Sequence, residues 1–132
     1  MYGVPKPKKN NLFNSGSFLR FSNASLHAEL YHDFMELSHI RVHFASIGLR
    51  RNKPLMLFLH GFPECWYSWR NQMIHFWEDY TVIAIDLRGY NRTSRPKHRV
   101  EYRLSLLVDD VKQVVDKLSY DGKVILVGHD WG

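Results

Sequence analysis

The chain has 132 residues, a length typical of a single domain that can bury a hydrophobic core. Hydrophobic residues make up 45% of it and charged residues 23%, proportions that exclude an intrinsically disordered protein. Lysine and arginine outnumber aspartate and glutamate by 18 to 13, an excess that a solvated surface explains better than an anionic membrane or an acidic partner. We therefore expect no nucleic-acid partner.

Cys65 is the single cysteine, which excludes an internal disulfide and fits a reducing compartment such as the cytoplasm. No apolar run approaches the roughly 18 residues of a membrane span. The segment 1–11 carries lysines but lacks the apolar core of a signal peptide. A cytoplasmic location is therefore the prediction.

Residues 1–30 are predicted to form an N-terminal tail. Pro5 and Pro7 interrupt regular structure there, and asparagine, serine and glycine are frequent as far as Ser25. Hydrophobic patterning begins at about Tyr31, so residues 31–132 are predicted to fold together.

The strands are indicated by two kinds of pattern. Alternating side chains at 34–37 and 41–45 predict the two strands of a hairpin. The segments 55–59 and 81–85 are apolar on both faces, as expected of strands buried within a parallel sheet. The segment 123–127 is predicted to be the last strand.

Two helices are predicted between these strands. The first is indicated by a core stripe of large apolar side chains at helical spacing: Trp66, Trp69, Met73 and Trp77. The second presents one apolar face, formed by Leu107, Val111, Val114 and Leu118. The order predicts an α/β fold with an N-terminal β-hairpin and a mostly parallel sheet that has helices on both faces.

The loop from residue 88 to 103 is rich in basic side chains, and a solvated surface is favoured there over an anion site. Asp86 and Arg88 are interpreted as a structural corner rather than as catalytic groups. A metal site at His39 and His43 is disfavoured because the sequence places no third ligand near them.

Two motifs follow predicted strands, at the end of the sheet where α/β proteins bind ligands. The segment Gly128-His129-Asp130-Trp131-Gly132 has the layout of a nucleophile elbow, a tight strand-to-helix turn that needs small flanking residues. Aspartate at its centre, in place of the commoner serine, indicates that Asp130 is a nucleophile that forms a covalent ester. A dinucleotide-binding domain is disfavoured because the sequence contains no G-x-G-x-x-G run.

The second motif, His60-Gly61-Phe62-Pro63, follows the strand at 55–59. In hydrolases with such an elbow, a backbone N–H from this loop and the N–H after the nucleophile form the oxyanion hole. The predicted donors are Phe62 and Trp131, and each fixed donor contributes roughly 3 to 4 kcal/mol of barrier lowering. The alternative is a Gly-Pro turn that only redirects the chain.

With these motifs, the chain resembles the N-terminal half of an α/β-hydrolase of the epoxide hydrolase family, truncated after the nucleophile elbow and without the lid. The resemblance extends from about Phe34 to Gly132. The matching segments are His60-Gly61-Phe62-Pro63-Glu64 with residues 66–70, Asp86-Leu87-Arg88-Gly89-Tyr90, and Gly128-His129-Asp130-Trp131-Gly132.

The resemblance implies a reaction. Asp130 attacks an epoxide carbon and forms a hydroxyalkyl ester, while two lid tyrosines protonate the opening oxygen. A histidine oriented by an acid then activates water, which releases a vicinal diol. The resemblance also implies a small epoxide substrate, a pocket lined by Phe62, Pro63 and Trp131, and no metal or organic cofactor. Because some members carry an N-terminal anchor, the endoplasmic reticulum membrane is the alternative location for a longer form.

The resemblance places the base histidine and the lid after Gly132, so the chain as given is expected to be inactive or to turn over poorly. A fragment of an epoxide hydrolase is the favoured interpretation. One alternative is a fragment of a haloalkane or haloacid dehalogenase-like hydrolase. The other is a non-catalytic short form that binds a partner through the exposed edge of its last strand.

Overall fold

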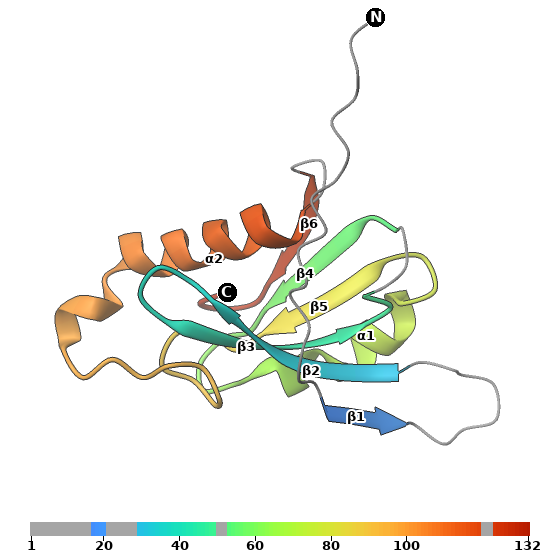
Figure 1. Cartoon of the computed structure of the whole chain (residues 1–132), viewed down its shortest axis with the longest axis horizontal. Coiled ribbons are helices and arrows are strands. Elements are labelled where there is room, and N and C mark those ends of the chain that lie inside the picture. Colours follow the sequence, from blue (N-terminus) through green and yellow to red (C-terminus); the bar gives the residue numbers. More distant parts are fainter. Residues whose placement is uncertain (1–16, 21–28, 50–52, 120–122) are drawn as a thin grey trace, which may run out of the picture.

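The computed structural model describes residues 17–20, 29–49, 53–119 and 123–132. These residues form one six-stranded sheet with helices on both faces (Figure 1). The strands are β1 (Ser17–Arg20), β2 (Glu29–Glu36), β3 (Arg41–Ile47), β4 (Leu55–Leu59), β5 (Thr81–Ile85) and β6 (Val124–Gly128). The helices are η1 (Trp66–Trp69), α1 (Arg70–Phe76), η2 (Arg99–Tyr102) and α2 (Leu104–Leu118), where η marks a short 3₁₀ helix.

The strand order is β1-β2-β3-β5-β4-β6, with β4 parallel to both of its neighbours and the other pairs antiparallel. This arrangement confirms the predicted α/β fold, but the described sheet is mixed rather than mostly parallel, because the N-terminal strands pair in the antiparallel sense. The register places Leu59 opposite both Ile85 and Gly128. The residues that follow β4, β5 and β6 therefore leave the sheet at the same side, where the carboxyl ends of these strands lie.

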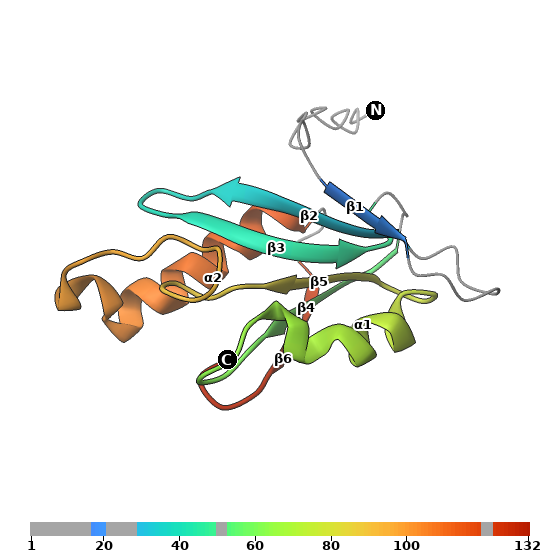
Figure 2. The same ribbon diagram turned by 90° about the horizontal axis from the view of Figure 1, so that it is seen from below.

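Two apolar layers hold the sheet between the helices. On one face Met73 and Trp77 from the α1 segment pack against Phe58 and other sheet residues. On the other face Val114 of α2 packs against Leu57 and its neighbours. Figure 2 shows α1 below β3 and β5. β4 and β5 are buried along their whole length, as predicted, and each large side chain buried there contributes about 1.5–3 kcal/mol.

The N-terminal part of the sheet is larger than the predicted hairpin. β2 begins at Glu29, well before the expected start at Phe34, and Leu30 pairs with Ile47 of β3. β1 falls within the range expected to be a tail and pairs with β2, while residues 1–16 and 21–28 lie outside the described part of the chain. The early half of β2 was missed because His32 and Asp33 look like surface residues but are buried.

The helix after β4 also differs in detail from the prediction. Trp66 to Trp69 form a 3₁₀ turn, and α1 begins only at Arg70. The predicted core stripe is confirmed, because Met73 and Trp77 are buried and Trp66 and Trp69 pack against them. No helix among the described residues is long and apolar enough to cross a bilayer.

A row of buried polar side chains crosses the sheet from β2 to the end of β5. Nδ1 of His43 lies 2.6 Å from Oδ2 of Asp86, and Nε2 of His43 lies 3.1 Å from Nδ1 of His32. Because the carboxylate of Asp86 can only accept, Nδ1–H of His43 donates to it, and Nε2 of His43 shares a hydrogen bond with Nδ1 of His32. Both ring nitrogens of His43 therefore have hydrogen-bond partners, whereas His39 is exposed.

Asp86 ties this row to the loops at the carboxyl edge of the sheet. Its carboxylate accepts the Trp66 backbone N–H at 2.9 Å and the Asn91 amide at 2.8 Å. Burial opposes ionisation of Asp86, but the hydrogen bonds from His43, Trp66 and Asn91 outweigh it and hold the pKa of Asp86 below its ordinary value.

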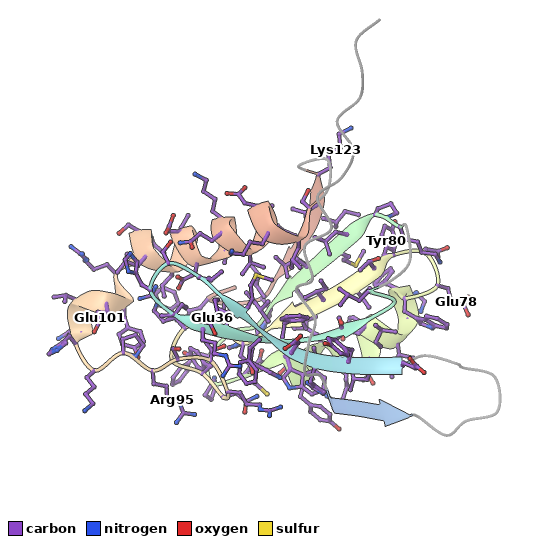
Figure 3. All side chains as sticks on the ribbon, in the orientation of Figure 1. Glu36, Glu78, Tyr80, Arg95, Glu101 and Lys123 are labelled. Carbon is purple, nitrogen blue, oxygen red and sulfur yellow. The ribbon has the colours of Figure 1, made fainter. Side chains whose placement is uncertain are left out.

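Arg88 completes the corner that was expected to be structural. Its guanidinium is buried and donates two hydrogen bonds of 2.7 Å to Asp110 of α2, so it does not belong to the solvated basic loop. The other basic side chains of that loop are exposed, and Arg95 points away from the sheet (Figure 3).

We expect the free energy of unfolding to decrease as the pH falls from about 6.5 to about 4. Burial, with the neighbouring charges of His43 and Arg92, lowers the pKa of His32 from 6.5 to about 4, so the unfolded chain binds a proton before the folded chain does. The free energy of unfolding decreases by at most about 3 kcal/mol over this range, and by less to the extent that solvent screens the charge on the ring.

The measurement is denaturant unfolding at about pH 7 and about pH 4.5. His32→Gln retains a donor toward His43 but does not titrate, so it should show a shallower loss of stability with acid than the unmodified chain. The same pH dependence in both proteins would contradict the assignment to His32.

We expect the 132-residue chain to self-associate as its concentration rises. β4 is the one strand that pairs with β6 among the described residues, and Ile125 and Leu126 on β6 are 42% and 51% exposed. An unpaired apolar edge strand is a template for pairing with another chain. Ile125→Lys should suppress the association in sedimentation experiments, whereas Val100→Lys, at an exposed apolar position in η2, should not. A chain that stays monomeric at all concentrations would show that this edge is protected.

Candidate active site

The residues after β6 form the turn predicted from the motif at the end of the chain. The Gly132 N–H donates to the His129 carbonyl at 3.0 Å and closes the turn. Asp130 sits at its apex with a φ of 57°, in the left-handed region that non-glycine residues rarely adopt. Such a conformation costs of order 1–3 kcal/mol and persists only where the surroundings impose it.

Close approach of the backbone explains the small residues on either side. A Cβ atom at Gly128 would lie 2.5 Å from the Gly132 carbonyl oxygen, so only glycine fits there. At Gly61, after β4, a Cβ would lie 2.6 Å from Cβ of Asp130 and 2.9 Å from the His129 oxygen. The loop after β4 and the turn after β6 are therefore in direct contact, and Figure 2 shows them side by side.

This contact places backbone donors on the Asp130 carboxylate. The Phe62 N–H donates to Oδ2 of Asp130 at 2.9 Å, and the Trp131 N–H also donates to the carboxylate. These two hydrogen bonds, first that of Phe62, lower the pKa of Asp130 from its ordinary value. The carboxylate is therefore ionised at neutral pH and remains exposed to solvent.

Glu64 has a local role that sequence reasoning missed. Its N–H donates to the Gly61 carbonyl at 3.0 Å, and its Oε2 accepts the Gly61 N–H at 3.1 Å. The same Oε2 lies 3.7 Å from Nδ1 of His129. The Phe62–Pro63 peptide bond between these groups is cis. The only signal in the sequence was the spacing of Glu64 three residues after Gly61.

The side chains expected to line a substrate pocket are exposed. Phe62 is 65% exposed and Trp131 is 70% exposed, and Pro63 is exposed as well. A cavity of about 670 Å³ lies between α2 and β6 and is bordered by Leu126 and Trp131. Asp130, Phe62 and Pro63 do not line it, so this cavity is separate from the carboxylate.

No group of three metal-binding side chains occurs within the part of the chain that the structure describes. Cys65 is half-buried next to the loop after β4. The arrangement can therefore be described by its carboxylate and backbone donors: an exposed, ionised carboxylate with one oxygen held by the N–H of Phe62.

Comparison with known proteins assigns the family. The sequence profile of the alpha/beta hydrolase fold matches residues 54–132. Human epoxide hydrolase 4 is 53% identical over 95 residues, which are 72% of this chain and 26% of the relative. Epoxide hydrolase 1 of Caenorhabditis elegans is 46% identical over 99 residues, which are 75% of this chain and 24% of the relative.

Solved structures agree with these relatives. An epoxide hydrolase from Vigna radiata is 42% identical in sequence, with a TM-score of 0.73. The match covers 78% of this chain and 32% of that structure. Epoxide hydrolase A of Mycobacterium thermoresistibile is 34% identical with a TM-score of 0.72, over 78% of this chain and 32% of that one. This chain spans about a quarter of the length of the curated relatives, 26% and 24% of the two named above. The chain belongs to the α/β-hydrolase superfamily and, within it, to the epoxide hydrolase family.

Proposed function

We propose that this chain carries the nucleophilic half of an epoxide hydrolase site, in which Asp130 opens an epoxide through an ester intermediate. The observation that supports this most is the hydrogen bond from the Phe62 N–H to Oδ2 of Asp130. It distinguishes the two carboxylate oxygens of Asp130. The relatives named as epoxide hydrolases support a small epoxide as the substrate class.

In the first step the other oxygen of Asp130, Oδ1, attacks an epoxide carbon. The carbon–oxygen bond of the epoxide breaks, and its electron pair goes to the epoxide oxygen, which takes a proton from an acid. The family resemblance assigns this proton to lid tyrosines that are not among the described residues. The lowered pKa of Asp130 favours this step, because only the carboxylate is nucleophilic.

In the second step water loses a proton to a base and attacks Cγ of the ester, and negative charge develops on Oδ2. The family resemblance assigns this base to a histidine that is not among the described residues; the Cγ–Oδ1 bond then breaks, and Oδ1 leaves with the product and takes the proton from the base. The Phe62 N–H already donates to Oδ2, so it stabilises this charge without reorganisation, and the Trp131 N–H is the second donor to the carboxylate. Each such donor lowers the barrier by roughly 3 to 4 kcal/mol. Collapse of the intermediate restores the Asp130 carboxylate and releases a vicinal diol.

The first step can be tested on the 132-residue chain itself. Incubation with excess styrene oxide should add the mass of one epoxide molecule at Asp130, as located by peptide mapping with mass spectrometry. Asp130→Asn should carry no adduct, because a neutral amide is a poor nucleophile. Asp116→Asn, which removes an exposed carboxylate on α2, should react like the unmodified chain.

An adduct that is absent, or that Asp130→Asn leaves unchanged, would refute the proposal for this chain. A parallel incubation with a haloalkane of similar size tests the dehalogenase alternative. Ester formation with the haloalkane alone would assign the site to that reaction class.

We expect Gly61→Ala to slow ester formation at least about tenfold while the chain still unfolds cooperatively. The new Cβ would meet the Asp130 Cβ and the His129 carbonyl, so the elbow must shift away from the Phe62 N–H. Misplacement of a reacting group by about 1 Å can cost about 100-fold in rate. Adduct formation followed by mass spectrometry over time gives the rate, and Ser68→Ala in η1 is the control. An unchanged rate would mean that the two loops are not required to be in contact.

A further inference from the structure

His60 is a buried histidine beside the site with no role in the reaction steps above. It follows β4 directly and is fully buried. Its ring packs edge-on against Tyr90, with 4.9 Å between the ring centroids. Buried in this way, the ring cannot contact solvent or substrate, so any role in the reaction must act through the groups that it touches.

Both ring nitrogens of His60 bond to backbone groups. Nε2 lies 3.0 Å from the N–H of Leu87, and Nδ1 lies 2.8 Å from the carbonyl oxygen of Gly61. A backbone N–H only donates and a carbonyl oxygen only accepts. The two contacts therefore define one state of the ring, which is neutral, with the proton on Nδ1 and a lone pair on Nε2 that accepts the Leu87 N–H.

The Gly61 carbonyl belongs to the same planar peptide unit as the Phe62 N–H. In a peptide unit the C=O and N–H groups are held in one plane by partial double bonding, so an anchor on the oxygen also orients the N–H. Here Nδ1–H of His60 at 2.8 Å holds the oxygen at one end, together with the Glu64 N–H at 3.0 Å, and the Phe62 N–H donates to Asp130 at the other. Donation to the oxygen also polarises the amide, which strengthens the N–H as a donor.

We propose that His60 is a positioning residue that aims the Phe62 N–H at Asp130 by donating from Nδ1 to the Gly61 carbonyl. It acts through that peptide and does not touch the reacting atoms. Its Nε2 accepts the N–H of Leu87 after β5, so the ring couples the corner after β5 to the loop after β4. The kinetic consequence of this assignment rests on the proposed function, whereas the hydrogen-bond arrangement does not.

Two matched variants separate the two bonds of the ring. In His60→Asn the amide nitrogen takes about the place of Nδ1 and can donate to Gly61, but the acceptor for Leu87 is lost. In His60→Gln the amide oxygen takes about the place of Nε2 and can accept from Leu87, but the donor to Gly61 is lost. Each variant loses one hydrogen bond of the same buried ring, so a purely structural role predicts similar effects for both.

The readout is the Asp130 carboxyl group, followed by carbon-13 NMR as a function of pH. In His60→Gln we expect the pKa of Asp130 to rise toward its ordinary value by about half a unit or more, and the Phe62 amide proton to move upfield, because the N–H is no longer aimed. His60→Asn should keep both signals close to those of the unmodified chain. Equal changes in the two variants, or no change in His60→Gln, would overturn the proposal.

A further measurement uses the unmodified chain, so its result does not depend on whether a variant folds. Nitrogen-15 shifts of the His60 ring should show the proton on Nδ1, and a proton on Nε2 would refute the assignment directly. The kinetic arm follows hydrolysis of the Asp130 ester after excess epoxide is removed, which should be about tenfold slower or more in His60→Gln. If no ester forms on the unmodified chain, the proposed function fails, while the NMR measurements still decide the role of His60.

Discussion

The parallel pairing of β4 with both β5 and β6 is the constraint on which the rest of the site depends. Because Leu59 lies opposite both Ile85 and Gly128, three loops leave the sheet at one edge. The loop after β4 and the turn after β6 then lie so close that Gly61 leaves no space for a side chain beside Asp130. A shift of one residue in the β4–β6 register would turn the side chains of β6 to the opposite faces and separate the Phe62 N–H from Asp130.

The electrostatics of the site come from the backbone more than from charged side chains. Asp130 is exposed, yet its pKa is lowered mainly by the N–H groups of Phe62 and Trp131. Two charged side chains of the corner after β5 bind other partners: Asp86 is bonded to His43, and Arg88 is bonded to Asp110. These pairs hold the corner after β5 in place, and that corner supplies the N–H that fixes the ring of His60. Rigid neighbours of this kind allow backbone dipoles to be aimed before the reaction begins.

The sequence predicted the elements that have a strong apolar pattern and the tight turn that has a strong motif. The strands at 55–59 and 81–85, the stripe from Trp66 to Trp77 and the strand beside the end of the chain were all found close to their expected places. The beginning of β2 was missed because a histidine in the sequence suggests an exposed position, whereas His32 is buried and bonded to His43. Hydrogen bonds between residues distant in the chain leave no periodic signal, so the roles of His60 and Glu64 required the structure.

The hydrogen bond between Phe62 and Asp130 joins residues 68 positions apart in the chain, and this separation has a consequence for folding. Contacts between distant residues form late, since the entropy of closing a long loop must be overcome first. On a ribosome, β4 emerges and can pair with β5 while β6 is still unmade. Until the elbow arrives, the Phe62 N–H has only water to bind. The order of synthesis therefore delays assembly of the Asp130 carboxylate with its backbone donors until β4 and β5 have been made.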